Sequence, residues 1–187
     1  MRTLALVMGT VAMTAAVASA EVTSGPQVGE QVGAFTVAKV AGNADDGVAD
    51  GKTLCYRCRM GQRPVVMVFA RSADENLAKF VKELEEEIEE HQDAKLTSFV
   101  NMLGTDATSL KKDAVEFVKA NGLERIAFVV PDEPANGPAD YKIAPDADLT
   151  IVCFKGGKVK ANHALAKGQL SDDKIDAIVE SACAMLD

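Results

Sequence analysis

A chain of 187 residues is long enough for one domain, or for one domain with an extension. Hydrophobic residues make up 48% of it and charged residues 26%, which are globular values that exclude wholesale disorder and a fibrous repeat. The formal net charge of −8 argues against nucleic acid or an anionic membrane surface as the main partner.

The first twenty residues predict a secretory signal peptide. Residues 1–2 give a positive start, residues 4–17 are mostly apolar, and residues 18–20 supply a small-residue cleavage pattern. The apolar stretch is shorter than the roughly 20 residues that span a bilayer, so a membrane anchor is the less favoured alternative. We therefore expect a secreted or periplasmic protein, with one domain over residues 21–187 and no membrane contact after cleavage.

The first half of that domain predicts two strands and a helix. Residues 35–40 have strand character, and residues 42–51 form an Asp- and Gly-rich loop. The apolar run PVVMVFA at 64–70 predicts a fully buried central strand. Residues 72–75 match a capping box, which starts a helix with its apolar face toward the core. The other face of that helix carries six glutamates, which we interpret as a solvated face, with a cation site or a basic partner as the alternatives.

The second half predicts three more strands, a hairpin and two more helices. The predicted strands lie at 96–103, 125–130 and 149–154, the hairpin turn at Gly156–Gly157 before a strand from Val159, and the helices at 108–120 and after Ser171. Strands that alternate with helices imply parallel pairing with right-handed crossovers, and the final hairpin makes the sheet mixed. We expect an α/β fold with a mixed central sheet flanked by helices.

Several short motifs carry a family resemblance. They are Val28–Gly29 with the strand that follows, Gly51–Lys52 before Gly61, the central strand 64–70, Tyr141–Lys142–Ile143, and the strand at 149–154 with its Gly156–Gly157–Lys158–Val159 ending. With this order of elements the chain resembles the thioredoxin-like superfamily, and most closely its redoxin branch of peroxiredoxin-like and TlpA-like exported proteins. The resemblance covers residues 28–186.

The same resemblance implies a reactive cysteine just after the central strand, where the N-terminus of the next helix lowers its pKa. Here residues 71–76 read RSADEN and contain no cysteine, and Ala73 and Asn76 stand where the family has its two cysteines. The family also keeps a proline before the later strand, but Leu149–Thr150 stands there and the nearest proline is Pro145. We therefore expect the usual redox centre to be missing and peroxidase activity to be absent.

Cys55 and Cys58 form a C-x-x-C pair that precedes the central strand. A strand of six or seven residues spans roughly 20 Å, so the pair is expected at the opposite end of that strand from the family's usual site. Disulfides persist outside the cytoplasm, and nearby cations favour the reactive thiolate. The basic residues around the pair are Lys52, Arg57, Arg59 and Arg63, and Tyr56 is an aromatic residue that could contact a partner. The pattern gives no sign of a helix terminus at the pair.

Two functions remain open on this pattern. The leading hypothesis is an atypical thiol–disulfide oxidoreductase or electron carrier, in which Cys55 or Cys58 attacks a disulfide of a partner protein. Cys55 is the weakly preferred nucleophile, because its solvent side is expected to be less crowded. The alternative is a non-enzymatic binding or scaffold module in which Cys55–Cys58 is a structural disulfide. Nothing in the sequence indicates the oligomeric state.

A metal or cofactor at the pair is not favoured. A zinc site needs two further ligands, and neither His91 nor His163 shows ligand spacing. Haem attachment is excluded, because Arg59 and not histidine follows Cys58. We therefore expect no cofactor and no metal. The two remaining cysteines are Cys153, which we predict to be an inert core thiol, and Cys183, one position off the inward face of the last helix, which leaves an intermolecular role open.

Overall fold

The computed structural model describes residues 22–186, so the predicted signal peptide lies outside the described residues. The strands are β1 (Val37–Ala41), β2 (Thr53–Leu54), β3 (Pro64–Ala70), β4 (Thr97–Met102), β5 (Ala127–Pro131), β6 (Leu149–Lys155) and β7 (Lys158–Leu165). The helices are α1 (Tyr56–Met60), α2 (Glu75–Glu90), α3 (Ala107–Asn121) and α4 (Asp172–Cys183), with short 3-10 helices η1 (Ala44–Asp46) and η2 (Ala139–Tyr141). Within residues 22–186, no helix combines the length and the apolar character needed to cross a bilayer.

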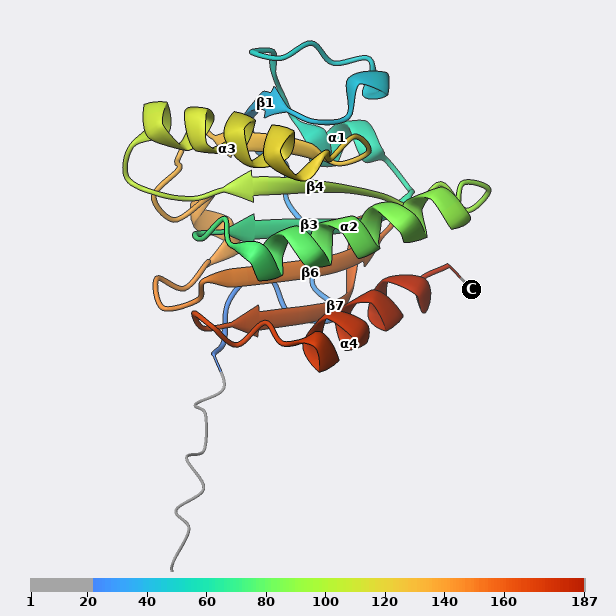
Figure 1. The fold of residues 1–187 in the computed structure, drawn as a ribbon. Coiled ribbons are helices and arrows are strands. Elements are labelled where there is room, and N and C mark those ends of the chain that lie inside the picture. The colour runs from blue at the N-terminus through green and yellow to red at the C-terminus, as the bar shows by residue number, and fades with distance from the viewer. Residues whose placement is uncertain (1–21, 187) are drawn as a thin grey trace, which may run out of the picture.

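All seven strands pair into one sheet in the order β2-β1-β5-β4-β3-β6-β7 (Figure 1). The three middle strands β3, β4 and β5 are parallel to one another. The outer pairings are antiparallel: β6 with β3, β7 with β6, and β1 with both β5 and β2. This arrangement confirms the predicted mixed α/β fold. The run at residues 64–70 is the middle strand β3, and all of its residues are buried.

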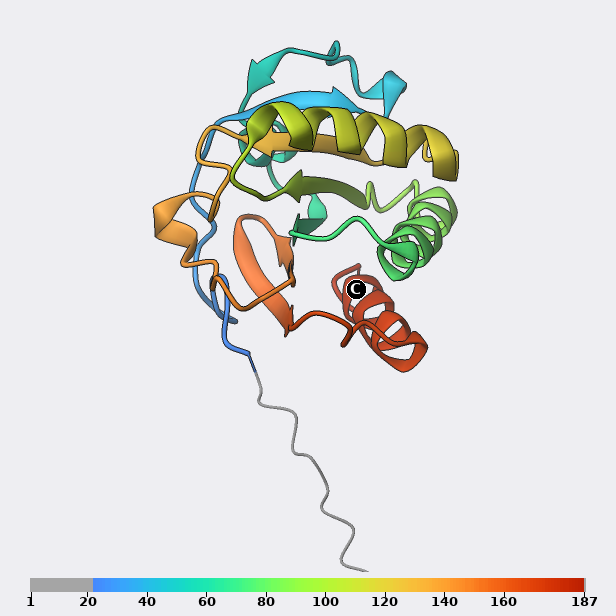
Figure 2. The ribbon, with the colours of Figure 1, turned by 60° about the vertical axis from the view of Figure 1, so that its left-hand side comes forward.

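The two faces of the sheet are covered differently. Helices α2, α3 and α4 cover one face, where their buried residues share one core with Val66, Val68 and Ala70 of β3 (Figures 1 and 2). The alternate residues Val65 and Met67 face the other way, into a second core closed by α1, η2 and the N-terminal segment. Because side chains alternate along a strand, β3 serves both cores, and α1 belongs to the face that the long helices leave free.

The helix after β3 begins later than the capping-box pattern predicts. Asp74 is its N-cap, and Asp74 Oδ1 accepts a hydrogen bond from the Leu77 amide at 2.9 Å. Ser72 instead donates its hydroxyl proton to Asp148 Oδ1 at 2.6 Å, so it ties the end of β3 to the loop before β6. The predicted box was therefore wrong in its residues, because Asp74 is an equally good cap and Ser72 has a tertiary partner.

Gly42 closes the end of β1 and allows the chain to turn toward η1. Its φ is +74°, and a Cβ there would lie 2.1 Å from the carbonyl oxygen of Ile126. We expect Gly42→Ala to lower the free energy of unfolding by about 3 kcal/mol, since it combines left-handed strain with a backbone collision.

Urea unfolding measures this loss of stability, and Gly51→Ala is the matched control. Gly51 has a φ of +82° but nothing within 4 Å of a Cβ, so its variant carries the strain alone, about 1 kcal/mol. Equal losses in the two variants would show that contact with Ile126 does not matter.

Candidate functional site

The cysteine pair lies at the start of the short helix α1. Cys55 is the N-cap of this helix, and a disulfide joins it to Cys58 with a Cα–Cα distance of 5.2 Å. The amide of Cys58 donates a hydrogen bond to Cys55 Sγ at 3.1 Å. The expectation that the pair lacks a helix terminus was therefore wrong. A helix of five residues leaves no periodic apolar pattern, and for that reason the sequence did not reveal it.

The two cysteines differ in exposure. Cys58 is exposed, whereas Cys55 is half-buried. Tyr56 and Met60, one turn apart, are both buried and fix α1 to the second core. The structure thus contradicts the reason for which Cys55 was preferred as the nucleophile, since its side is the more crowded one. It also contradicts the expectation that Tyr56 is free to contact a partner.

Tyr56 anchors the cysteine helix in two ways. Its ring stacks on Phe99 of β4 with 5.5 Å between the centroids, and its hydroxyl donates a short hydrogen bond to Asp46 Oδ2. Burial, and then the hydrogen bond to Asp46, raise the pKa of Tyr56 well above its ordinary value. The phenol therefore stays protonated over the physiological range and remains a donor to Asp46.

Asp46 in turn pairs with a buried lysine. Lys39 is 1% exposed, and its Nζ donates to Asp46 Oδ1 at 2.9 Å and to the carbonyls of Asn43 and Val48. The amide of Val48 donates to the same carboxylate oxygen at 2.7 Å. This Lys39–Asp46–Tyr56 network links β1, η1 and α1, so the position of the disulfide depends on groups that the sequence motif does not include.

The arginines near the pair also hold the backbone in place. Arg57 Nε donates to the carbonyl of Val32 at 3.0 Å, and Arg59 Nη2 donates to the carbonyl of Asp46. Lys52 and Arg63 are exposed. The predicted basic surroundings therefore consist of two guanidinium groups bound to neighbouring loops and two cations in solvent.

Comparison with known proteins supports the fold alone. No protein-family profile and no curated protein matches the chain. Among solved structures, a Chlorobium tepidum protein named as a thiol:disulfide interchange protein DsbE matches with a TM-score of 0.63 and 15% identity, over 86% of this chain and 99% of that one. A protein named as a disulfide isomerase from Bacteroides thetaiotaomicron also gives 0.63, with 19% identity over 88% and 94%.

A third structure, peroxidoxin BcpB from Mycobacterium tuberculosis, matches with a TM-score of 0.58 and 13% identity, over 85% of this chain and 97% of that one. This chain is similar in structure to nearly the whole length of two proteins named for thiol–disulfide chemistry and of one peroxidoxin. This similarity decides the architecture. The fold is thioredoxin-like. This confirms the fold that the resemblance in the sequence motifs implied.

In this thioredoxin-like protein, the corner after β3 is held by polar contacts without cysteine. The Arg71 guanidinium donates to the carbonyls of Ala135 at 2.7 Å and Ala147 at 3.0 Å. Ala73 and Asn76 are exposed on either side of the cap residue Asp74. Arg71 therefore joins the loops on both sides of η2 to the end of β3. None of the residues described at this corner offers a thiol.

The cysteine pair lies at the other end of β3. Helix α1 comes just before Pro64, the first residue of β3, and Arg71 comes just after the last. In Figure 1, α1 and the start of α2 lie at opposite ends of the sheet. The pair therefore lies at the opposite end of β3 from the corner after that strand, as expected from the sequence.

The two free cysteines are in different environments. Cys153 is fully buried in β6, and burial raises the pKa of its thiol to about 12. Cys183 is half-buried at the end of α4, where its Sγ donates to Glu87 Oε2 at 3.1 Å. Burial and then this hydrogen bond raise the pKa of Cys183 to about 11. The structure thus agrees with the prediction of Cys153 as a core thiol.

Alkylation of the folded, oxidised protein tests these environments. At pH 8 a thiol with a pKa of about 12 is ionised in only about one molecule in ten thousand, and Cys153 is also shielded. We expect iodoacetamide to leave Cys153 unmodified for hours and to modify Cys183 slowly, as read by peptide mass spectrometry. When guanidinium unfolds the protein, both thiols should react with iodoacetamide promptly. Prompt labelling of Cys153 in the folded state would contradict its burial.

Proposed function

We propose that this thioredoxin-fold protein is exported and exchanges thiols with disulfides through Cys55 and Cys58. The observation that supports the proposal is the position of the pair: a disulfide between an exposed and a half-buried sulfur, with Cys55 Sγ accepting a hydrogen bond from the Cys58 amide. An amide donor of this kind stabilises a thiolate, which is the nucleophilic form. The relatives in fold named above are thiol–disulfide proteins or a peroxidoxin by name, which is consistent with such a role.

The reaction starts from the reduced pair. The Cys55 thiolate attacks a disulfide of a partner protein, a Cys55–partner disulfide forms, and one partner sulfur leaves as a thiolate and takes up a proton. Cys58 then loses its proton and attacks Cys55 Sγ, which closes the Cys55–Cys58 bond and releases the second partner thiol. The partner gains two electrons and this chain loses two, so an external dithiol must reduce it again.

Cys55 is the better nucleophile on the present geometry, for a reason other than exposure. The Cys58 amide already points at its sulfur, so a negative charge there has a donor in place. The exposed Cys58 is then free to swing toward the mixed disulfide and resolve it. Helix α1 has only five residues, so the hydrogen bond and not a long helix dipole carries this argument.

The equilibrium reduction potential of the pair is the direct test. The purified domain, residues 21–187, is equilibrated in glutathione or dithiothreitol buffers, and the fraction of Cys55–Cys58 disulfide is read by mass after alkylation. A potential above about −270 mV, together with reduction of insulin by the dithiol form, supports exchange. A potential below about −300 mV with no insulin reduction indicates a structural bond and contradicts the proposal.

A structural role is the second candidate function, and the anchoring of α1 favours it. Tyr56 is buried, and both Arg57 and Arg59 hold neighbouring loops, so the disulfide could serve only to hold α1 in a binding or scaffold module. A disulfide that closes so short a loop raises the free energy of unfolding by about 2 kcal/mol, on the view that it lowers the entropy of the unfolded chain. The redox titration therefore separates the two functions, because a scaffold needs the bond and never exchanges it.

Export is a separate part of the proposal and has its own test. The full chain is expressed in a bacterium with a secretion system, and the N-terminus of the product outside the cytoplasm is sequenced. Cleavage after Ala20 is the expected result, and an uncleaved product that stays in the cytoplasm would contradict it.

A further inference from the structure

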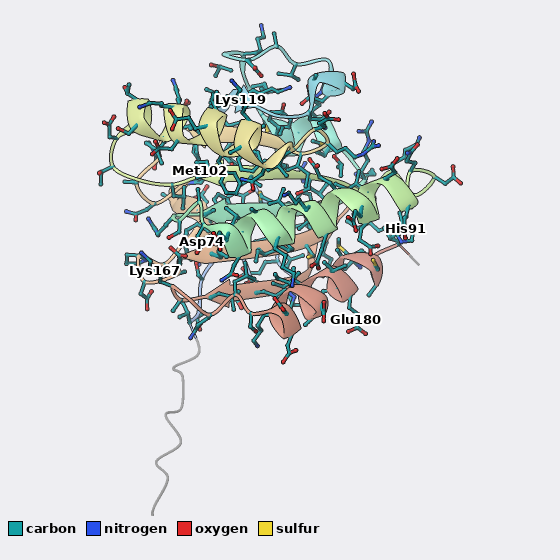
Figure 3. The ribbon with its side chains drawn as sticks, in the orientation of Figure 1. Asp74, His91, Met102, Lys119, Lys167 and Glu180 are labelled. Atoms are coloured by element: carbon teal, nitrogen blue, oxygen red, sulfur yellow. A yellow bond between two sulfur atoms is a disulfide. The ribbon has the colours of Figure 1, made fainter. Side chains whose placement is uncertain are left out.

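The C-terminal ends of α2 and α4 meet at a cluster of three chemically different ligand groups. Glu87 and His91 lie one turn apart at the end of α2, and Cys183 is the last residue of α4. One ligand atom from each, a carboxylate oxygen, an imidazole nitrogen and Sγ, lie within 4.8 Å of one another. All three residues are half-buried. Figure 3 shows His91 at the end of α2, away from Asp74 at its start, and therefore away from the corner after β3.

The distances suit a tetrahedral cation. Glu87 Oε2 lies 3.1 Å from Cys183 Sγ and 3.3 Å from His91 Nε2. In a tetrahedral zinc site with bonds of about 2.0–2.3 Å, neighbouring ligand atoms are about 3.3–3.6 Å apart. Two of the three ligand-to-ligand distances are therefore within a few tenths of an ångström of this geometry, and the third pair, Cys183 Sγ and the His91 ring nitrogen, lies within 4.8 Å. A modest closure of the three groups would surround one ion, and the fourth position remains for water.

The local charge also favours a cation. Two helices end here, and the C-terminus of a helix carries a partial negative charge. Glu90, in the last turn of α2, acts electrostatically on the Cys183 thiol in addition to Glu87. Lys155 of β6 donates to the carbonyls of Met185 and Leu186 beyond α4. The cluster is therefore anionic once Cys183 loses its proton.

We propose that Glu87, His91 and Cys183 form a Zn²⁺ site that joins the C-terminal ends of α2 and α4. On binding, the Cys183 thiol releases its proton to solvent in place of sharing it with Glu87, and no electrons are transferred. Thiolate, imidazole and carboxylate together select zinc over calcium or magnesium, which take oxygen ligands. The site is independent of the Cys55–Cys58 pair, so it does not rest on the function proposed above.

The sequence contained half of this signal. Glu87 and His91 have the i, i+4 spacing that places two side chains on one helix face, a pairing that the sequence analysis of His91 did not consider. The third ligand follows Glu87 by 96 residues and comes from another helix. Only the parallel packing of α2 and α4 on one face of the sheet brings it close.

Cobalt spectroscopy and zinc binding test the site in the oxidised protein, in which the disulfide keeps Cys55 and Cys58 from binding metal. We expect Co²⁺ to give a thiolate charge-transfer band in the near ultraviolet and Zn²⁺ to displace it. Cys183→Ser should abolish the band, and His91→Gln and Glu87→Gln should weaken Zn²⁺ binding by tenfold or more in calorimetry. Zn²⁺ should also protect Cys183 from alkylation and raise the melting temperature of the wild type.

Matched controls come from the same chain. His163→Gln changes the other histidine, and Glu86→Gln changes an exposed glutamate next to Glu87; both variants should bind Zn²⁺ as the wild type does. The absence of a thiolate band in the wild type would overturn the proposal. So would Zn²⁺ binding that the Cys183→Ser and His91→Gln variants retain in full, because the metal would then lie elsewhere.

Discussion

Asp46→Ala is expected to lower the free energy of unfolding by about 3 to 5 kcal/mol, since it leaves a buried lysine ammonium without its counter-ion. Lys39 is 1% exposed, and Asp46 is its only carboxylate partner among the described contacts. The same substitution removes the acceptor of the Tyr56 hydroxyl and of the Val48 amide. Two backbone carbonyls also accept hydrogen bonds from Lys39 Nζ. They limit the loss of stability but do not neutralise the charge.

Asp45→Ala is the control for this measurement. Asp45 precedes Asp46 in η1 but is exposed, so its removal should change stability by less than about 0.5 kcal/mol. Urea unfolding followed by circular dichroism gives both values. A loss below about 1 kcal/mol for Asp46→Ala would contradict a buried ion pair and would mean that water reaches Lys39.

The regular elements could be predicted because each has a long apolar periodicity or an uninterrupted apolar run. The apolar run of β3 was placed with its bounds, and the helix predicted at 108–120 corresponds to α3, Ala107–Asn121. The buried residues of α3 recur at helical spacing and are Leu110, Ala114, Phe117 and Val118. Apolar periodicity reports burial directly, so a single sequence suffices to place such elements in a sheet with helices on it.

The site could be predicted only in part, because its contacts are tertiary. The C-x-x-C motif identified Cys55 and Cys58. However, Lys39 lies in a strand, where a charged side chain ordinarily points to solvent, and its partner Asp46 lies in the segment 42–51 that was predicted only as a loop. Nothing in the spacing of Tyr56 indicated that it stacks on Phe99. Pairings across the fold leave no periodic signal, so they appear only once the chain is folded.

The fold and the motif carry different information about function. The thioredoxin-like architecture normally presents cysteine where β3 ends and α2 begins, but here Arg71 and Ser72 bind the surrounding loops at that corner. The disulfide lies where β3 begins, on a helix that packs against the opposite face of the sheet from α2. An activity cannot be transferred from the fold to this pair, and the chemistry of the pair has to be tested directly.

The two single cysteine variants are expected to behave differently, and this is the sharpest test of thiol exchange. In Cys58→Ser, Cys55 keeps the amide donor at position 58 and should form a mixed disulfide with a partner, which then persists because no resolving thiol remains. In Cys55→Ser, the remaining Cys58 thiol lacks that donor and should trap at least tenfold less. Both variants should lose all turnover in the insulin assay, since each lacks half of the pair.

Mixed disulfides are read on non-reducing gels with a disulfide-bonded peptide as the probe, and Cys183→Ser in the same backgrounds removes the other accessible thiol. Circular dichroism of both variants checks that α1 stays folded, which its anchors Tyr56 and Met60 favour. Equal trapping by the two variants would contradict the role given to the Cys58 amide. If neither variant trapped the peptide, thiol exchange would be contradicted altogether, and the brace that holds α1 against the second core would be the function left for this disulfide.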